Sequence, residues 1–199
     1  QCTSEFPRGS YAVNIIVQQT NRLRDEHLKI CVEHRAPVYI TSLGNPAPVI
    51  EAAKSYGAKV FCDVTNLVHA KKCADSGCDG FIAVGQGAGG HAGPFPTHLL
   101  VRSLKKSFPE LPVMAAGGIA DGPSILAALA SGAEAAYCGT RFIASSESSV
   151  SADYTKAIID AGMEDIVMTD RISGTPCTII NTPYAQKIGT HQNALERWL

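Results

Sequence analysis

The stretch Val113-Met114-Ala115-Ala116-Gly117-Gly118-Ile119-Ala120-Asp121-Gly122 runs from an apolar strand through a glycine turn to the start of a helix. The next strand, at 135–138, is also followed by glycine, in Gly139-Thr140. Two successive strand ends thus offer free backbone N–H groups, beside a helix N-terminus near Pro123. Barrels of the (β/α)8 class bind phosphate in such a place, after strands seven and eight. The stretch therefore favours an α/β fold of the (β/α)8 TIM barrel class over a doubly wound sheet.

Outward from this stretch, short apolar strands alternate with helices along the chain. We expect strands at 12–17, 37–41, 59–64, 80–84, 112–116 and 135–138. We expect helices at 21–33, 47–56, from Thr65 or Asn66 to 75, at 98–108 and at 123–130. Three helices end in Ser-x-Gly or Ser-Gly, with Gly57, Gly77 and Gly132 at the left-handed position that closes a helix. Six such strands predict a parallel sheet buried on both faces.

The numbering of these strands also bears on the domain organisation. If the last two are barrel strands seven and eight, residues 1–150 supply strands 3–8 and the first two βα units are lacking. Residues 151–199 are then expected to form a C-terminal helix and an irregular cap segment over the mouth of the barrel. The chain begins at Gln1 without Met and ends at Leu199 inside an amphipathic pattern, so we expect a fragment truncated at both ends.

A second glycine-rich loop, at 85–93, follows the fourth strand and presents His91. Five glycines within nine residues allow positive φ angles and close approach to a flat ligand. Gly85-x-Gly87-x-x-Gly90 also matches the spelling of a dinucleotide-binding loop. That motif needs a helix to open at its third glycine, whereas Pro94 and Pro96 follow here, so we reject this interpretation.

Composition narrows the function classes. The chain has 199 residues, 45% hydrophobic and 18% charged, with a formal net charge of -1. The sequence contains no run of basic residues that would indicate nucleic-acid binding. It also contains no segment with the roughly 18 consecutive apolar residues of a membrane span. No signal-peptide pattern opens the chain. Its seven cysteines lack a C-x-x-C pair, which predicts neither a disulfide framework nor a metal site and suits a reducing cytoplasm.

Four motifs together resemble one flavin family. They are Asn14 in Val-Asn-Ile, Gly-Ala-Gly-Gly-His-Ala-Gly at 87–93, Ala-Ala-Gly-Gly-Ile-Ala-Asp-Gly at 115–122 and Cys-Gly-Thr-Arg-Phe-Ile-Ala-Ser-Ser-Glu at 138–147. In this order and spacing they are similar to the FMN-dependent nitronate monooxygenases, over about residues 11–147. Flavin-dependent enoyl-acyl-carrier-protein reductases and an NADH:quinone reductase branch look similar at the same loops.

The resemblance implies a cofactor, a reaction and a set of site residues. FMN would be bound by Asn14, Gly89, Gly90, Ala116, Gly117, Gly118, Gly139 and Thr140. His91 matches the family's catalytic histidine, which would hydrogen-bond the nitro group or remove the α-proton of a nitroalkane. The implied reaction is oxidation of alkyl nitronates by O₂ to a carbonyl compound and nitrite. The resemblance is also compatible with an enzyme that forms a homodimer. The alternatives are an NAD(P)H-dependent flavin reductase and a non-catalytic FMN- or phosphate-binding barrel fragment.

One residue departs from the family pattern. Some members carry a lysine beside the flavin where this chain has Asp63, and an acid there would oppose negative charge on the reduced ring. Either Asp63 turns away or it has a partner that the sequence does not reveal.

Other candidate residues have simpler structural interpretations. His98 is expected in the first turn of a helix, with only a weak claim to touch ligand, and His27, His34 and His69 on helix surfaces. Cys62 and Cys138 are expected to be buried in strands. Asp121 is expected to cap the helix after it, and Asp153 the helix beginning at Tyr154.

Overall fold

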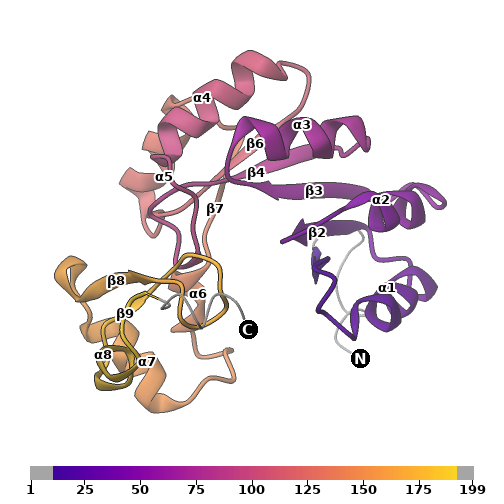
Figure 1. Ribbon diagram of the computed structural model, residues 1–199. Helices are drawn as coiled ribbons and strands as arrows, with labels where there is room; N and C mark the ends of the chain where they lie inside the picture. Colours follow the sequence, from indigo (N-terminus) through magenta and orange to yellow (C-terminus); the bar gives the residue numbers. More distant parts are fainter. Residues whose placement is uncertain (1–10, 192–199) are drawn as a thin grey trace.

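The protein is described by a computed structural model that covers residues 11–191 (Figure 1). Its larger part is a parallel sheet of six strands in the order β1-β2-β3-β4-β6-β7. The strands are β1 (Val13–Ile16), β2 (Val38–Ser42), β3 (Lys59–Val64), β4 (Gly80–Val84), β6 (Val113–Ala116) and β7 (Ala135–Tyr137). The helices between them are α1 (Arg24–Glu33), α2 (Ala47–Lys54), α3 (Leu67–Asp75), α4 (Thr97–Ser107) and α5 (Gly122–Ala130). All six predicted strands and the five helices between them are present, with small shifts at their ends.

The order of the strands distinguishes the two fold classes. Strands that neighbour one another in the sheet follow one another along the chain, and the five helices all lie on the outer face (Figure 1). A doubly wound sheet reverses its strand order at a switch point and carries helices on both faces. The six βα units therefore form an arc of a (β/α)8 barrel, as predicted, with β1 and β7 at its edges.

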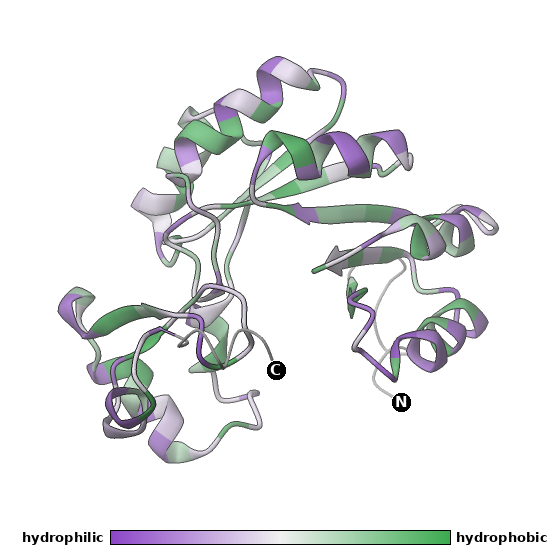
Figure 2. Ribbon diagram, viewed as in Figure 1, coloured by the Kyte–Doolittle hydropathy of each residue, from purple (hydrophilic) through white to green (hydrophobic). Residues whose placement is uncertain are grey.

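Two layers of apolar side chains hold the arc together. The larger layer fills the space between the sheet and its helices and includes Tyr39, Phe81 and Leu104, all 0% exposed. The smaller layer lies on the inner face, where Ile40, Ile82 and Ala116 are buried. Figure 2 shows the corresponding pattern, with apolar strands and helices whose polar side faces outward. Because the central strands carry apolar side chains on both faces, they read as continuous apolar runs.

The ends of the helices follow local sequence signals. Asn66 caps α3 by accepting a hydrogen bond from the His69 N–H at 2.8 Å, and Asp121 caps α5 by accepting one from the Ser124 N–H at 2.9 Å. The predicted helix-closing glycines have positive φ angles, at Gly57 (82°), Gly77 (83°) and Gly132 (98°).

The predicted cap of the next long helix was wrong. Helix α7 (Ala152–Asp160) is capped by Ser151, whose hydroxyl accepts from the Tyr154 N–H at 3.3 Å. Asp153 instead lies inside the first turn, where its negative charge still favours the helix N-terminus.

The C-terminal part of the described chain forms a second, smaller sheet. Strands β8 (Ile166–Thr169) and β9 (Cys177–Ile180) pair antiparallel, and β9 also pairs with β5 (Gly90–His91) of the glycine-rich loop. The short helices α6 (Thr140–Ile143), η2 (Met163–Asp165) and α8 (Pro183–Ile188) complete this part. Our expectation of an irregular segment was therefore wrong for residues 166–180.

The cysteines are all free among the described residues, and one is placed differently from our prediction. Cys62 is buried in β3, as expected, whereas Cys138 lies just past the end of β7 and is half-buried. The strand ends early there because the chain turns at Gly139 into α6. Within residues 11–191, every helix is too short or too polar to reach across a lipid bilayer.

Candidate functional site

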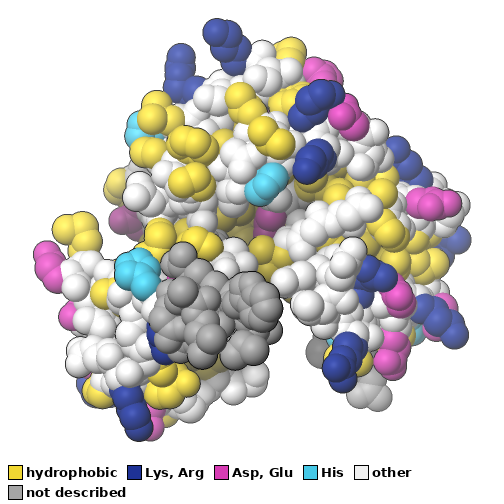
Figure 3. Space-filling model, in the orientation of Figure 1, with side chains coloured by type: hydrophobic (Ala, Val, Ile, Leu, Met, Phe, Trp, Pro, Cys, Tyr) yellow, Lys and Arg dark blue, Asp and Glu magenta, His cyan; other side chains and the backbone are white. Residues whose placement is uncertain are grey.

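Most of the predicted site residues lie at the carboxyl ends of β4, β6 and β7, whereas Asn14 lies within β1 at the opposite edge of the sheet. At the carboxyl ends the molecule is hollowed between the larger sheet and the C-terminal part (Figure 3). In parallel sheets, partner residues of neighbouring strands point to the same face, and the register pairs Asn14 with Ile40 and Ala116 with Tyr137. The inner face therefore presents Asn14 at one edge strand and Tyr137 at the other, on either side of the apolar inner layer.

The first half of the loop at 85–93 packs tightly against the turn after β6. A Cβ atom added at Gly117 would lie 2.8 Å from the Ala88 nitrogen, and one at Gly87 would lie 3.3 Å from the Gly118 nitrogen. A Cβ at Gly89 would collide with the hydroxyl of Thr140. The fold therefore brings Gly89, Gly117, Gly118 and Thr140 together from three separate loops, in a cradle where side chains at Gly89 and Gly117 would collide with their neighbours.

Backbone N–H groups of this cradle and of Gly139 beside it are available to a ligand, among them two in the loops after β6 and β7. Those of Gly118 and Gly139 donate to no acceptor within the described residues. By contrast, the N-terminus of α5 is closed by its own residues, since Asp121 and Ser124 cap each other's backbone. Free N–H groups without covering side chains suit the oxygens of a phosphate. The sequence predicts a phosphate at these two loops, beside the helix near Pro123. The helix end is closed, so the N–H groups of the loops, including those of Gly118 and Gly139, remain the candidate donors.

His91 lies in the second half of the same loop and is held by the C-terminal part of the chain. It is exposed, pairs with Cys177 across β5 and β9, and its Nε2 lies 2.9 Å from the Ser173 hydroxyl. That hydroxyl also donates to the Thr175 carbonyl at 3.3 Å. Because a serine hydroxyl has one proton, Ser173 accepts from a protonated Nε2. With the Ser173 proton on the Thr175 carbonyl, neutral His91 carries its proton on Nε2, and its Nδ1 has no partner among the described residues.

Thr178 on β9 fixes the backbone between the two halves of the loop. Its hydroxyl donates to the Ala88 carbonyl in a short hydrogen bond and lies 3.4 Å from the Gly90 carbonyl. Gly90 itself has a φ of 80° with open space around its Cα. Gly89 and Gly90, two of the residues that the resemblance assigns to FMN, are therefore positioned by a strand that the sequence did not predict.

Asp63 has the partner that the sequence did not reveal. Ser42 Oγ lies 2.5 Å from Asp63 Oδ2 and 3.3 Å from Asn14 Oδ1. Burial raises the pKa of Asp63 to about 6, although the Ser42 hydrogen bond opposes the rise. Burial and the charge of Asp63 also raise the pKa of Tyr137. Asp63 thus points into the site rather than away from it.

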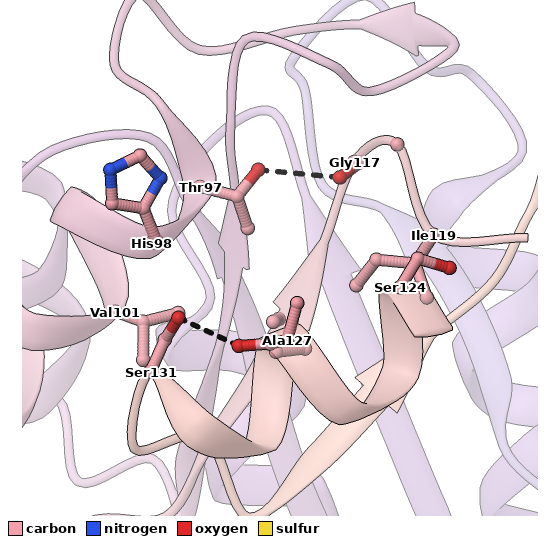
Figure 4. A pocket seen from close by; sticks show the side chains of 11 residues that line it. Thr97, His98, Val101, Gly117, Ile119, Ser124, Ala127 and Ser131 are labelled. Carbon is pink, nitrogen blue, oxygen red and sulfur yellow. Dashed lines mark hydrogen bonds between the residues drawn. The ribbon is translucent and has the colours of Figure 1, made fainter. Parts of the chain in front are cut away.

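A separate pocket of about 250 Å³ lies between α4 and α5 (Figure 4). Gly117 and Gly118 line it together with His98, which is in the first turn of α4 as predicted. The Thr97 hydroxyl points to the Gly117 carbonyl at 3.4 Å (Figure 4). No other predicted site residue lines this pocket, so we place the candidate site on the inner side of the turn and not here.

Sequence reasoning missed three residues that shape the site. Ser42, Ser173 and Thr178 are common polar residues without a motif around them. The run Cys177-Thr-Ile-Ile180 is β-branched and could have indicated a strand. Nothing local could have named its partner, because Thr178 and Gly90 are 88 residues apart.

Comparisons with known proteins show which family this chain resembles. The sequence model of the family described as nitronate monooxygenase matches residues 4–197. A (3aS,4S,5R,7aS)-5-hydroxy-7a-methyl-1-oxo-octahydro-1H-indene-4-carboxyl-CoA dehydrogenase of Mycobacterium tuberculosis is 32% identical over 85% of this chain and 48% of its own length. A nitronate monooxygenase of Paraburkholderia phytofirmans is 38% identical over 74% of this chain and 43% of its own length.

A solved structure shows the same fold. FabK from Thermotoga maritima has a TM-score of 0.82 and 40% identity, over 88% of this chain and 56% of that protein. The chain spans about half the length of the curated relatives it matches.

Proposed function

The chain belongs to the nitronate monooxygenase family, and on this basis we propose that it takes part in FMN-dependent oxidation of alkyl nitronates by O₂, yielding a carbonyl compound and nitrite. The proposal rests mainly on one observation: Gly89, Gly117, Gly118 and Thr140 meet in one cradle. Gly89 precedes His91 by two residues in the same loop. The family and the FabK relative are flavin enzymes, which supports a flavin in this cradle.

The residues present fit the parts of FMN. Gly118 and Gly139 would donate backbone N–H groups to the phosphate, and Thr140 its hydroxyl. The resemblance implies that Asn14, Gly89 and Gly90 would lie against the ring, and the absence of a side chain at Gly89 leaves the space beside Thr140 open. When bound, FMN supplies the two-electron redox chemistry and the reaction with O₂.

His91 would handle the proton and the charge of the substrate. Ser173 holds Nε2–H, so the Nδ1 lone pair can accept the α-proton of a neutral nitroalkane. Once protonated, the imidazolium can donate a hydrogen bond to a nitro oxygen of an anionic nitronate. We place this reaction in the reducing cytoplasm, because the described cysteines are all free.

A second candidate function is a dehydrogenase or NAD(P)H-dependent reductase of the same fold. The observation in its favour is the similarity to the carboxyl-CoA dehydrogenase of Mycobacterium tuberculosis, at 32% identity over 85% of this chain. The carboxyl of Asp63, in place of a cation at the site, also sets this chain apart from some nitronate oxidisers. A thioester or nicotinamide would then replace the nitronate beside His91.

A visible spectrum distinguishes these functions. The protein is mixed with FMN without oxygen, and alkyl nitronate, NADH and an acyl-CoA thioester are added to separate samples. Bleaching of the flavin band by nitronate alone is the expected result. Bleaching only by NADH or by the thioester would favour the second candidate. A bound flavin that none of them reduces would leave a non-catalytic FMN-binding module.

The role of His91 is tested with a matched pair of histidine variants. His91→Ala is expected to slow reduction by a neutral nitroalkane by about 10²- to 10⁴-fold, the usual contribution of a general base. His98→Ala, on α4, is the control and should keep the wild-type rate. FMN binding should be unchanged in both variants, so loss of binding in His91→Ala would point to a structural role.

A further inference from the structure

Three oxygen atoms from neighbouring strands lie in a row on the inner face of the sheet. Ser42 Oγ is the middle atom, 2.5 Å from Asp63 Oδ2 and 3.3 Å from Asn14 Oδ1. A carboxylate oxygen and an amide oxygen only accept hydrogen bonds, and a serine hydroxyl has a single proton to donate. With Asp63 ionised, Ser42 can therefore satisfy one of its two neighbours but not both.

When Asp63 is protonated, each of the three oxygen atoms takes part in a hydrogen bond. The carboxyl O–H then donates to Ser42 Oγ, and the Ser42 O–H donates to Asn14 Oδ1. The 2.5 Å spacing is at the short end of the range for O–H···O hydrogen bonds. We propose that Asp63 is a proton-holding positioning residue, which acts through Ser42 to turn the amide nitrogen of Asn14 into the site as a hydrogen-bond donor.

The surroundings of Asp63 favour the neutral acid. Ser42 on β2 is 8% exposed, and the β4 residue in register with Asp63 is the apolar Ile82. The titratable groups that feel its charge are Cys62 on β3, Cys73 on α3 and Tyr137 on β7, none of them a cation. Within the described residues Asp63 forms no ion pair. Burial without a counter-charge raises the pKa of this carboxyl to about 6.

Ionisation of Asp63 reverses the direction of these hydrogen bonds. Ser42 then donates to the carboxylate, and its oxygen is free to accept from the amide nitrogen of Asn14, which turns the amide oxygen toward the site. The site thus offers a donor and no net charge when Asp63 is protonated, and an acceptor beside an anion when it is not. A ligand rich in hydrogen-bond acceptors prefers the protonated state, so its binding should be accompanied by proton uptake above pH 6.

The inference rests on the proposed function only in naming FMN as that ligand, and its first test needs no ligand. The full-length protein is labelled with ¹³C at aspartate carboxyls and titrated by NMR. The resonance missing from Asp63→Asn is that of Asp63, and we expect its midpoint near 6. A midpoint at or below the ordinary 3.8 overturns the proposal.

The second test measures FMN dissociation by quenching of flavin fluorescence between pH 5 and 8. The wild-type dissociation constant should rise above pH 6 by up to about tenfold per pH unit, the limit for uptake of one proton. Asp63→Asn should bind FMN about as tightly as the wild type does at pH 5, without this rise.

Riboflavin is the control, because a phosphate monoester has a second pKa of about 6 and titrates in the same range. Equal slopes for wild type and Asp63→Asn would overturn the proposal. If FMN binds at no pH, the proposed function fails, while the carboxyl titration still decides whether Asp63 holds the proton.

Discussion

The loop at 85–93 is held by two sheets that differ in how deeply they are buried. In the six-stranded sheet, Val60, Phe81 and Val113 are 0% exposed, because their side chains lie in the layer between the sheet and its helices. In the three-stranded sheet only Thr169 and Cys177 are buried. The larger sheet fixes the first half of the loop, through the Gly85 N–H and the Ala116 carbonyl at 3.0 Å. The smaller sheet fixes the second half, which carries His91.

Because of this difference, the two sheets should contribute differently to the free energy of unfolding and to the position of the His91 side chain. Free energy of folding scales with apolar area removed from water, so it should reside mainly in the larger sheet and its helices. The smaller sheet contributes little burial, yet it sets where the imidazole of His91 lies. Substitutions in the first region should change unfolding, and substitutions in the second should change the site with little change in unfolding.

The largest effect is expected from Leu104→Ala. Leu104 on α4 is 0% exposed, and truncation of such a side chain removes buried area and leaves a cavity. The free energy of unfolding should fall by about 2–5 kcal/mol, measured by urea denaturation. Leu99→Ala on the same helix is the control, since Leu99 is 52% exposed. Equal losses in the two variants would contradict a core centred on the helix side of the larger sheet.

The next effect is a pH dependence of stability that comes from Asp63. Its folded pKa of about 6 lies above its ordinary 3.8, so the folded state holds the proton longer than the unfolded state. The stabilising contribution is thus complete below pH 3.8 and is lost as pH rises to about 6. The wild type should lose at most about 3 kcal/mol over this window relative to Asp63→Asn, at roughly 1.36 kcal/mol per pKa unit.

Urea denaturation of both proteins at pH 4, 5, 6 and 7 gives this difference. Other carboxyls, among them Glu134 with a lowered pKa, act in the opposite direction in both proteins and cancel. A difference that does not change with pH would mean that Asp63 ionises normally in the folded state.

A smaller loss is expected where the loop meets the larger sheet. A Cβ at Gly85 would lie 2.6 Å from the Thr97 Cα, closer than backbone can yield without shifting. Gly85→Ala should therefore lower the free energy of unfolding by about 1–3 kcal/mol. Gly122→Ala, where the added Cβ meets nothing within 4 Å, should be neutral or slightly stabilising. Thermal unfolding compares the stability of the two variants. An unchanged stability of Gly85→Ala would show that the backbone in the first half of the loop can shift to accept a side chain.

Most of the larger sheet could be predicted from the sequence, because its signals are local. Apolar runs such as Lys59–Val64 and Gly80–Val84, and glycines such as Gly57 that close helices, depend on neighbours a few residues away. The cradle was predictable for a related reason, since the ends of parallel strands must meet at one edge of the sheet. Gly117 and Thr140 follow strands that proved to be adjacent.

The rest of the site depends on contacts that no local pattern encodes. His91 and Ser173 are 82 residues apart, and Ser42 and Asp63 are 21 apart on different strands. The antiparallel pairing of β9 with a two-residue strand inside a glycine-rich loop has no periodicity to detect. Asp63 was visible as an unusual residue, but whether it holds a proton depends on the Ser42 and Asn14 oxygens beside it.

The smallest effect on stability, and the sharpest test of the division between the two sheets, is expected from Ser173→Ala. Ser173 is exposed, so the free energy of unfolding should change by no more than about 0.5 kcal/mol. Its hydroxyl lies 2.9 Å from His91 Nε2, and its loss should let neutral His91 populate both tautomers. The ¹⁵N chemical shifts of the imidazole report the tautomers without any ligand. Ser146→Ala is the control, because Ser146 bonds only the neighbouring Glu147 among the described residues. An unchanged imidazole spectrum in Ser173→Ala would mean that the smaller sheet carries His91 but does not orient it.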